Sequence, residues 1–245
     1  MISLAVDIGN SVAKAAVFYD RELQTVAHKN SRERLSGWLE ELAKTWAPEV
    51  CGVVATGRKK DELRPNFPKQ LLQITRFLTG ETPAPFVVAY RTRATLGADR
   101  LAAIAGAFSQ VPDASFLVID AGTALTIDAF QQEKGYSGGI ISPGMQMRFQ
   151  ALHRSTANLP LVEPQPMKSY LGTSTAGAIR TGVMRGMIGE MQYYITHYRK
   201  SWGANLKVFL TGGDTQWFEN HLKNVNFVEP LLVLTGIREL LLFND

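Results

Sequence analysis

The sequence predicts an α/β protein composed of two similar halves. Short apolar runs typical of strands alternate with amphipathic stretches typical of helices. An apolar run that ends in Asp-x-Gly occurs at Asp7 and recurs at Asp120, and a second apolar run follows each turn. The 245 residues are enough for two compact domains. We expect one domain at residues 1–112 and the other at residues 113–245, separated at a Pro-Asp turn signal.

The first half has the hydrophobic patterns of a mixed α/β domain. A Gly-Asn turn separates its first two apolar runs and predicts a hairpin. Asn30 and Glu33 resemble the capping pair of a helix N-terminus, and apolar residues at helical spacing follow them. We expect strands at residues 2–7, 13–18, 25–27, 51–55 and 85–89, and helices at residues 35–46 and from about Gly97.

The second half begins with the same strand-turn-strand pattern, and residues 125–130 should form the second strand. A long helical pattern then covers residues 175–200, and a Leu-rich helix follows Pro230. Between them, an apolar strand at residues 207–210 ends at Thr211-Gly212-Gly213. These glycines could let a nucleotide base or ribose pack on bare backbone, although a Gly-Gly turn is usually only a turn.

Several classes of protein are excluded by composition and pattern. No stretch approaches the roughly 18 uninterrupted apolar residues of a membrane span. The first residues lack the basic and apolar segments of a signal peptide, so we expect a cytoplasmic protein. Cys51 is the only cysteine, which excludes an intrachain disulfide and a cysteine-based metal cluster. The four histidines lack metal-ligand spacing.

The formal net charge of +4 does not by itself predict a nucleic-acid-binding surface. The densest basic residues are Arg58, Lys59, Lys60 and Arg64, followed by Arg91 and Arg93. Neither stretch is long or interleaved with aromatic residues. We expect the first to be solvated surface, whereas the second could form a basic wall for an anionic ligand. Nucleic acid is therefore not an expected partner.

The two Asp-x-Gly turns have features of a phosphate-binding site. Glycine permits close approach, and the backbone N–H groups of such a turn can form an anion nest. Ser11 and Lys14 could add donors, while Asp7 and Asp120 could hold cations that neutralise a polyphosphate. Neither turn is a P-loop or a dinucleotide-binding motif. One such turn is usually an ordinary hairpin, but the matched pair favours the binding role.

Gly97-Ala98-Asp99-Arg100 lies at an expected helix start. Because a helix N-terminus stabilises a carboxylate, Asp99 could accept or orient a hydroxyl proton. Arg100 could bind a carboxylate or phosphate through its planar guanidinium. The alternative is that both are solvated residues of the first helical turn.

Six motifs, taken in order, resemble those of the type III pantothenate kinases. They are Asp7-Ile8-Gly9-Asn10-Ser11, Leu96-Gly97-Ala98-Asp99-Arg100, Asp120-Ala121-Gly122-Thr123-Ala124, Gly138-Gly139-Ile140-Ile141-Ser142-Pro143-Gly144, Gly172-Thr173-Ser174-Thr175 and Thr211-Gly212-Gly213. Together they span nearly the whole chain. Ser11 stands where this family usually has Thr, and Ser174 stands where many members have Asn.

This resemblance implies two ribonuclease-H-like domains around a central cleft, the fold of the acetate kinase, sugar kinase, Hsp70 and actin superfamily. It implies a homodimer that phosphorylates the primary hydroxyl of pantothenate with ATP, the first step of coenzyme A biosynthesis. The implied cofactors are Mg²⁺ and a monovalent cation, K⁺ or NH₄⁺.

The resemblance also implies roles for individual residues. The ATP phosphates would contact Asp7, Ile8, Gly9, Asn10, Ser11, Val12, Ala13 and Lys14, with Thr123 as a further ATP contact. Pantothenate would contact Tyr90, Gly97, Ala98, Asp99, Arg100 and Thr175. Asp7 would lie near the divalent ion, Asp120 would bind the monovalent cation, and Asp99 would be the catalytic base.

Two other functions stay open. One is a nucleotide-binding accessory transcription regulator, a role described for members of this same family. The other is a kinase of a different small alcohol, such as a sugar. A neutral sugar would leave Arg100 without a charged partner, and no helix-turn-helix with a basic recognition helix stands out.

Gly182, Gly186 and Gly189 share one face of the long helix. Glycine in a helix costs about 1 kcal/mol relative to Ala, so a repeated glycine face suggests that close packing compensates. We expect this face to lie in or near the dimer interface. The alternative is tight packing within one subunit.

Overall fold

The computed structural model describes residues 1–31, 33–57, 60–64, 67–167 and 169–245. The chain forms two compact units. The first contains Met1–Pro112 and Leu231–Asp245, and the second contains Asp113–Pro230. The helix at the end of the chain therefore packs in the first unit, whereas the expected boundary after residue 112 puts it in the second domain. No helix of the described ranges is long and apolar enough to cross a membrane.

The first unit is built on a five-stranded sheet with the order β3-β2-β1-β4-β5. Its strands are β1 (Ile2–Ile8), β2 (Val12–Tyr19), β3 (Glu22–Asn30), β4 (Val50–Ala55) and β5 (Thr75–Phe77). Strands β1, β2 and β3 pair antiparallel, and β4 and β5 continue the sheet in parallel from β1. The predicted hairpin is thus confirmed, and its third strand is longer than expected.

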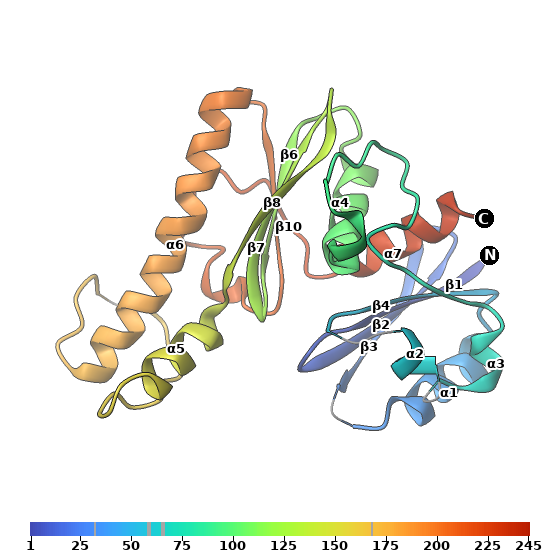
Figure 1. The fold of residues 1–245 in the computed structure, drawn as a ribbon, viewed down its shortest axis with the longest axis horizontal. Coiled ribbons are helices and arrows are strands. Elements are labelled where there is room, and N and C mark those ends of the chain that lie inside the picture. Colours follow the sequence, from blue (N-terminus) through green and yellow to red (C-terminus); the bar gives the residue numbers. More distant parts are fainter. Residues whose placement is uncertain (32, 58–59, 65–66, 168) are drawn as a thin grey trace. The chain divides into compact units, whose positions relative to one another are not determined.

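Helices cover both faces of this sheet (Figure 1). They are α1 (Leu35–Trp46), α2 (Lys60–Leu63), α3 (Lys69–Leu72), α4 (Ala98–Gln110) and α7 (Leu232–Phe243), with a short 3₁₀ helix η2 (Arg93–Thr95) before α4. Alternation along β1 sends Leu4, Val6 and Ile8 into one core with α1 and α3. The residues between them, including Asp7, face the side of α4 and α7.

Glycines allow α7 to pack closely against both the sheet and α4. A Cβ at Gly236 of α7 would overlap the carbonyl oxygen of Ala102 in α4, and one at Gly106 of α4 would overlap the carbonyl of Leu232. On the other side of α7, a Cβ at Gly52 of β4 would meet the side chain of Ile237. The apolar side chains of α7 are therefore buried in the first unit, which explains why this helix does not belong to the second.

Two local predictions for the first half are wrong. The cap of α1 is Arg34, with no side-chain cap bond, and Glu33 instead donates its backbone N–H to the Asn30 carbonyl at 3.0 Å. Residues 85–89 do not form a strand, although Val88 makes an isolated bridge. Proline lacks the N–H that a central strand requires, and Phe86 packs on Phe108 with ring centroids 5.1 Å apart.

The second unit repeats the sheet topology of the first. Its strands are β6 (Phe116–Ala121), β7 (Ala124–Gln131), β8 (Gly135–Pro143), β9 (Lys207–Thr211) and β10 (Phe227–Val228), in the order β10-β9-β6-β7-β8. Strands β6, β7 and β8 are antiparallel, and β9 and β10 run parallel to β6. The strand pairing thus agrees with the repeat seen in the sequence.

Helices α5 (Met145–Arg154) and α6 (Thr175–Trp202) pack on one face of this second sheet (Figure 1). The core between the sheet and these helices contains Leu117, Ile119 and Ile127 of the sheet and Met184 and Met187 of α6. Between β9 and β10 the chain forms the short 3₁₀ helix η3 (Thr215–Trp217).

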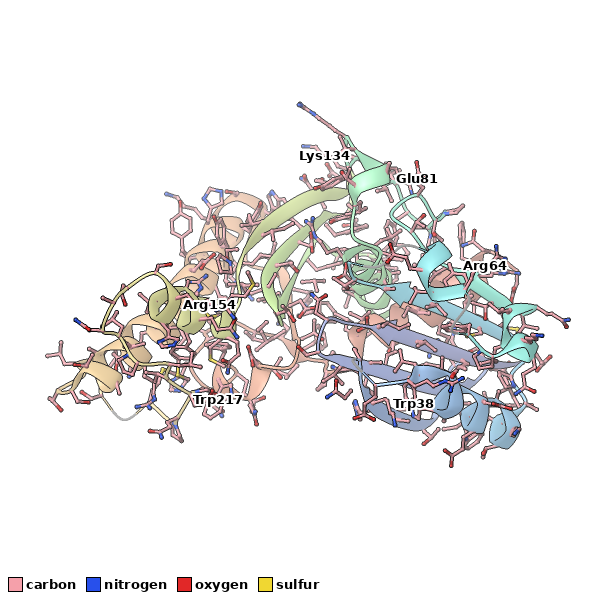
Figure 2. All side chains as sticks on the ribbon, turned by 60° about the horizontal axis from the view of Figure 1, so that its bottom comes forward. Trp38, Arg64, Glu81, Lys134, Arg154 and Trp217 are labelled. Atoms are coloured by element: carbon pink, nitrogen blue, oxygen red, sulfur yellow. The ribbon has the colours of Figure 1, made fainter. Side chains whose placement is uncertain are left out.

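The basic stretch at the start of α2 is only partly described. Arg58 and Lys59 lie outside the described residues. Arg64 is exposed and lies at the surface of the first unit (Figure 2), as expected for a solvated basic residue.

We expect Gly236→Ala to lower the free energy of unfolding by about 2 kcal/mol or more, because the added methyl group overlaps the backbone of α4. Gly37→Ala in α1 is the matched control, since a Cβ there meets nothing within 4 Å. That change should raise stability by up to about 1 kcal/mol through helix propensity alone. Urea unfolding of both variants tests this, and equal stability of the two would contradict the close packing of α4 and α7.

Candidate functional site

The hairpin between β1 and β2 presents the first set of predicted site residues. The backbone N–H of Gly9 donates to the Val12 carbonyl at 3.2 Å and closes the turn. Asn10, Ser11 and Val12 are exposed at its tip, where their backbone and polar groups can meet a ligand. Ile8 and Ala13 are fully buried. Their side chains anchor the hairpin, so only their backbone groups are suited to binding.

Asp7 lies near the end of β1, opposite Lys14 of β2 in the antiparallel register. Burial raises the pKa of Asp7 to about 6, the negative charge of Asp99 adds to this rise, and Lys14 opposes it. Two carboxylates on one side of the sheet thus repel one another. A divalent cation would offset this repulsion, and oxygen donors are the ligands that Mg²⁺ prefers. The Asp7 carboxylate is therefore suited to contribute one oxygen ligand to such an ion.

The N-terminus of α4 holds the second set of predicted site residues. Gly97 is the N-cap, and a Cβ there would overlap the Asp99 carboxylate, which explains the glycine. The Asp99 carboxylate accepts two hydrogen bonds, from the backbone N–H of Arg100 at 2.8 Å and from the Thr56 hydroxyl at 3.0 Å. Asp99 is thus a half-buried acceptor at a helix N-terminus, held in a defined orientation.

Arg100 is buried, with 6% of its surface exposed, and its guanidinium lies 5.6 Å from the centre of the Tyr90 ring. The alternative that Arg100 is a solvated surface residue is therefore wrong. A guanidinium is able to pair with a carboxylate or phosphate, and an aromatic ring stabilises its charge from one side. By contrast, Arg93 does not form an open basic wall, because its guanidinium donates to the carbonyls of Gly80 and Thr82.

In the second unit, Asp120 occupies the position on β6 that Asp7 occupies on β1. The N–H of Gly122 donates to the Ala124 carbonyl at 3.1 Å, and Thr123 is exposed at the tip of this shorter turn. A carboxylate oxygen of Asp120 lies near the Gly122 backbone, because a Cβ at Gly122 would lie 3.1 Å from it. The second turn therefore also combines an aspartate, a glycine and a hydroxyl.

Two glycine motifs of the second unit pack against this turn. A Cβ at Gly144 would overlap the carbonyls of Gly122 and Thr123. Gly212 has a φ of 102°, which favours glycine, and its added Cβ would overlap the carbonyl of Ala121. Two motifs from distant parts of the sequence thus pack against the turn that a third motif forms.

Asp214 belongs to the same region but was not predicted as a site residue. Its backbone N–H donates to the Ala121 carbonyl at 2.9 Å. Burial raises the pKa of this carboxyl to about 6. The available signal was its place directly after the two glycines that follow β9, a strand that pairs with β6.

Thr175 is the exposed first residue of α6. The Ser174 side chain caps the helix by accepting the Gly177 N–H at 3.1 Å. Serine and asparagine are both good N-cap residues, so either side chain at position 174 is able to cap α6.

The glycine face of α6 is open within the described part of the subunit. A Cβ at Gly182, Gly186 or Gly189 would meet nothing within 4 Å, and all three residues are exposed. The alternative of tight packing inside one subunit is therefore wrong. Ala178 and Tyr193 extend the same exposed face toward the two ends of the helix.

Residues 3–197 match a family model described as type III pantothenate kinase. The chain belongs to the type III pantothenate kinase family. A type III pantothenate kinase of Phocaeicola vulgatus is 42% identical over 245 residues, and the match covers 100% of this chain and 99% of that relative. The family predicted from the six motifs is thus confirmed.

Solved structures confirm the predicted fold class. A protein from Sinorhizobium meliloti named as a 2-dehydro-3-deoxygalactonokinase matches with a TM-score of 0.60 at 14% identity, over 97% of both chains. A Campylobacter jejuni protein named as a Baf family transcriptional activator matches with a TM-score of 0.58 at 22% identity, over 98% of both chains. With the two mixed sheets, these matches show that this type III pantothenate kinase family member shares the α/β fold of the kinase from Sinorhizobium meliloti.

We expect Asp214→Asn to stabilise the protein above about pH 6 and not below about pH 4. The pKa of Asp214 is raised in the folded state, so the charged form costs stability, and wild-type stability should fall as pH rises through this range. The variant's gain should reach about 1 kcal/mol, less than the full shift because the side chain is partly exposed. Urea unfolding between pH 4 and pH 8 measures it, and a pH-independent difference would contradict the burial of this charge.

Proposed function

We propose that this chain transfers the terminal phosphoryl group of ATP to the primary hydroxyl of pantothenate and so forms 4'-phosphopantothenate, the first step of coenzyme A biosynthesis. The observation that carries the proposal is the Asp99 carboxylate, fixed by two donors next to the buried Arg100, in a chain of this kinase family. An acceptor for a hydroxyl proton and a partner for a carboxylate thus stand side by side at one helix end.

The hairpin of the first unit would bind the phosphates of ATP. The N–H groups around Gly9 and the hydroxyl of Ser11 would donate to phosphate oxygens, and Lys14 would contribute positive charge. Asp7 would hold the divalent cation, whose charge would offset the effects of burial and of Asp99 and favour the charged carboxylate. Mg²⁺ supplies charge neutralisation on the polyphosphate when bound.

The N-terminus of α4 would bind pantothenate. Asp99 would accept the proton of the attacking hydroxyl, and Arg100 would pair with the carboxylate, which is the formal charge of this substrate. Tyr90 would fix the guanidinium from one side. Gly97 and Ala98 would offer backbone contacts.

Phosphoryl transfer suits such a site because it depends mainly on positioning and charge neutralisation, with little covalent work for the protein. Asp99 does not need to be a strong base, since it must only receive the proton as the bond to phosphorus forms. A rigidly held carboxylate therefore serves this reaction better than a mobile one.

The turn of the second unit would hold the monovalent cation and a further ATP contact. Asp120 would bind K⁺ or NH₄⁺, and the exposed hydroxyl of Thr123 would donate to ATP. The glycines packed beneath the turn support this role, because they fix its backbone close to the Asp120 carboxylate.

We also propose that the chain forms a homodimer through the open glycine face of α6. Glycine in a helix lowers stability, so an exposed row of three glycines is more readily explained by a second helix that approaches closely. The exposed Tyr193 next to this row would add apolar contact area.

We expect the purified protein to release ADP from ATP only when pantothenate is present, faster in K⁺ than in Na⁺. Asp99→Asn should lower kcat at least about 100-fold, because the amide cannot accept the hydroxyl proton. Asp113→Asn is the matched control, since Asp113 is exposed and has no proposed role. A coupled assay of ADP release measures both variants.

The absence of pantothenate-dependent turnover in K⁺ from folded, dimeric protein would contradict the proposed substrate. Full activity of Asp99→Asn would instead reject the proposed base and keep the substrate. Equal rates in K⁺ and Na⁺ would contradict the proposal that Asp120 binds K⁺ or NH₄⁺ for the reaction.

We expect Gly186→Leu to convert the dimer to monomers, because the leucine side chain would separate the two helices. Gly37→Leu is the matched control, since Gly37 is also an exposed helical glycine with no neighbour within 4 Å of its added Cβ. Sedimentation velocity over a range of concentrations measures the assembly state. A folded Gly186→Leu variant that stays dimeric at every concentration would contradict this interface.

A further inference from the structure

Thr56 links the first unit's two groups of site residues, although no sequence motif singled it out. It directly follows β4, and its backbone N–H donates to the Ile8 carbonyl of β1 at 3.0 Å. Its hydroxyl donates to Oδ2 of Asp99 at 3.0 Å. The side chain is half-buried. One residue thus bonds both to the strand that carries Asp7 and to the helix end that carries Asp99.

The two hydrogen bonds on Asp99 come from different elements. Oδ1 accepts the N–H of Arg100, which belongs to the same helical turn, and Oδ2 accepts the hydroxyl of Thr56. The terminal torsion of an aspartate side chain is broad, so a single local bond leaves the carboxylate free to turn about that bond. The second donor, anchored on the sheet, removes this freedom.

We propose that Thr56 is a positioning residue that fixes the carboxylate of Asp99 for proton transfer. This inference rests on the proposed function, in which Asp99 is the base. Through its bond to Ile8, Thr56 also ties the base to the strand that leads into the phosphate-binding hairpin. Thr56 therefore fixes the orientation of the base relative to the end of β1, next to the hairpin that would bind the phosphates.

The chemistry of threonine suits this role. A carboxylate only accepts hydrogen bonds, and a hydroxyl can donate one. Branching at Cβ restricts the first side-chain torsion, so the hydroxyl is held in place with little freedom to lose. Valine has nearly the same shape without the hydroxyl, and serine keeps the hydroxyl without the methyl group. These two substitutions separate the hydrogen bond from packing.

The test compares Thr56→Val, Thr56→Ser and a matched control, Thr75→Val. Thr75 is also half-buried in the first unit, and its hydroxyl donates to the Leu71 carbonyl at 2.7 Å, so the control loses a comparable bond. We expect Thr56→Val to lower kcat about 10- to 100-fold with little change in KM for pantothenate, as a misplaced base does. Thr56→Ser should retain kcat within about 3-fold, and Thr75→Val should keep the wild-type kcat.

A double-mutant cycle with Asp99→Asn separates positioning from an independent effect. If Thr56 acts through Asp99, Thr56→Val should lower kcat by less than about 2-fold in the Asp99→Asn background. Additive losses would overturn the proposal, as would a wild-type kcat for Thr56→Val or a change confined to KM. Thermal unfolding checks that each variant is folded, and Thr56→Ala replaces Thr56→Val if the latter is not.

The cycle also distinguishes a failure of Asp99 as the base from a failure of Thr56 as the positioning residue. A wild-type kcat for Asp99→Asn would reject the base itself and with it the positioning role. An inactive Asp99→Asn beside an unimpaired Thr56→Val would reject Thr56 alone and leave the proposed function intact.

Discussion

The close approach of α4 and α7 is the constraint on which the proposed active site depends. Backbone meets backbone at Gly106 and Gly236, and α7 in turn rests on the sheet at Gly52. These contacts set how far α4 stands from the sheet. The N-terminus of α4 carries Asp99 and Arg100, so their distance from β1 follows from three positions that lack a side chain. Small residues far from the chemistry thus determine where the chemistry can occur.

Local pattern was enough to predict much of this fold. The hairpins at Asp7 and Asp120 were visible because a turn glycine follows an apolar run, and the start of α4 was expected near Gly97, where the structure has it. Residues 85–89 were wrongly predicted as a strand because their composition is apolar. In the structure, the Phe86 ring packs on Phe108 of α4. The place of α7 was missed because a Leu-rich helix does not reveal which sheet it will cover. That choice is made by glycines on its partners.

The candidate site divides in the same way. Asp99 and Arg100 stood out as an acidic and a basic residue at a helix start. The structure adds that the Asp99 carboxylate accepts two hydrogen bonds and that Arg100 is buried. Thr56 could not be found by pattern, because its importance arises from the parallel pairing of β4 with β1. Asp214 likewise gains its environment from the pairing of β9 with β6. Sequence motifs therefore located the groups that touch ligands better than the groups that hold them.

The division of the chain has a consequence for the order of folding during synthesis. The second unit is continuous from Asp113 to Pro230, so all of its strands are synthesised before α7. The second unit interrupts the first, so the helix that supports α4 is synthesised only after the whole second unit. Although it is synthesised first, the amino-terminal unit completes its core last, against the usual order of domain folding. Until α7 is synthesised, the face of α4 that carries Gly106 lacks the helix that covers it.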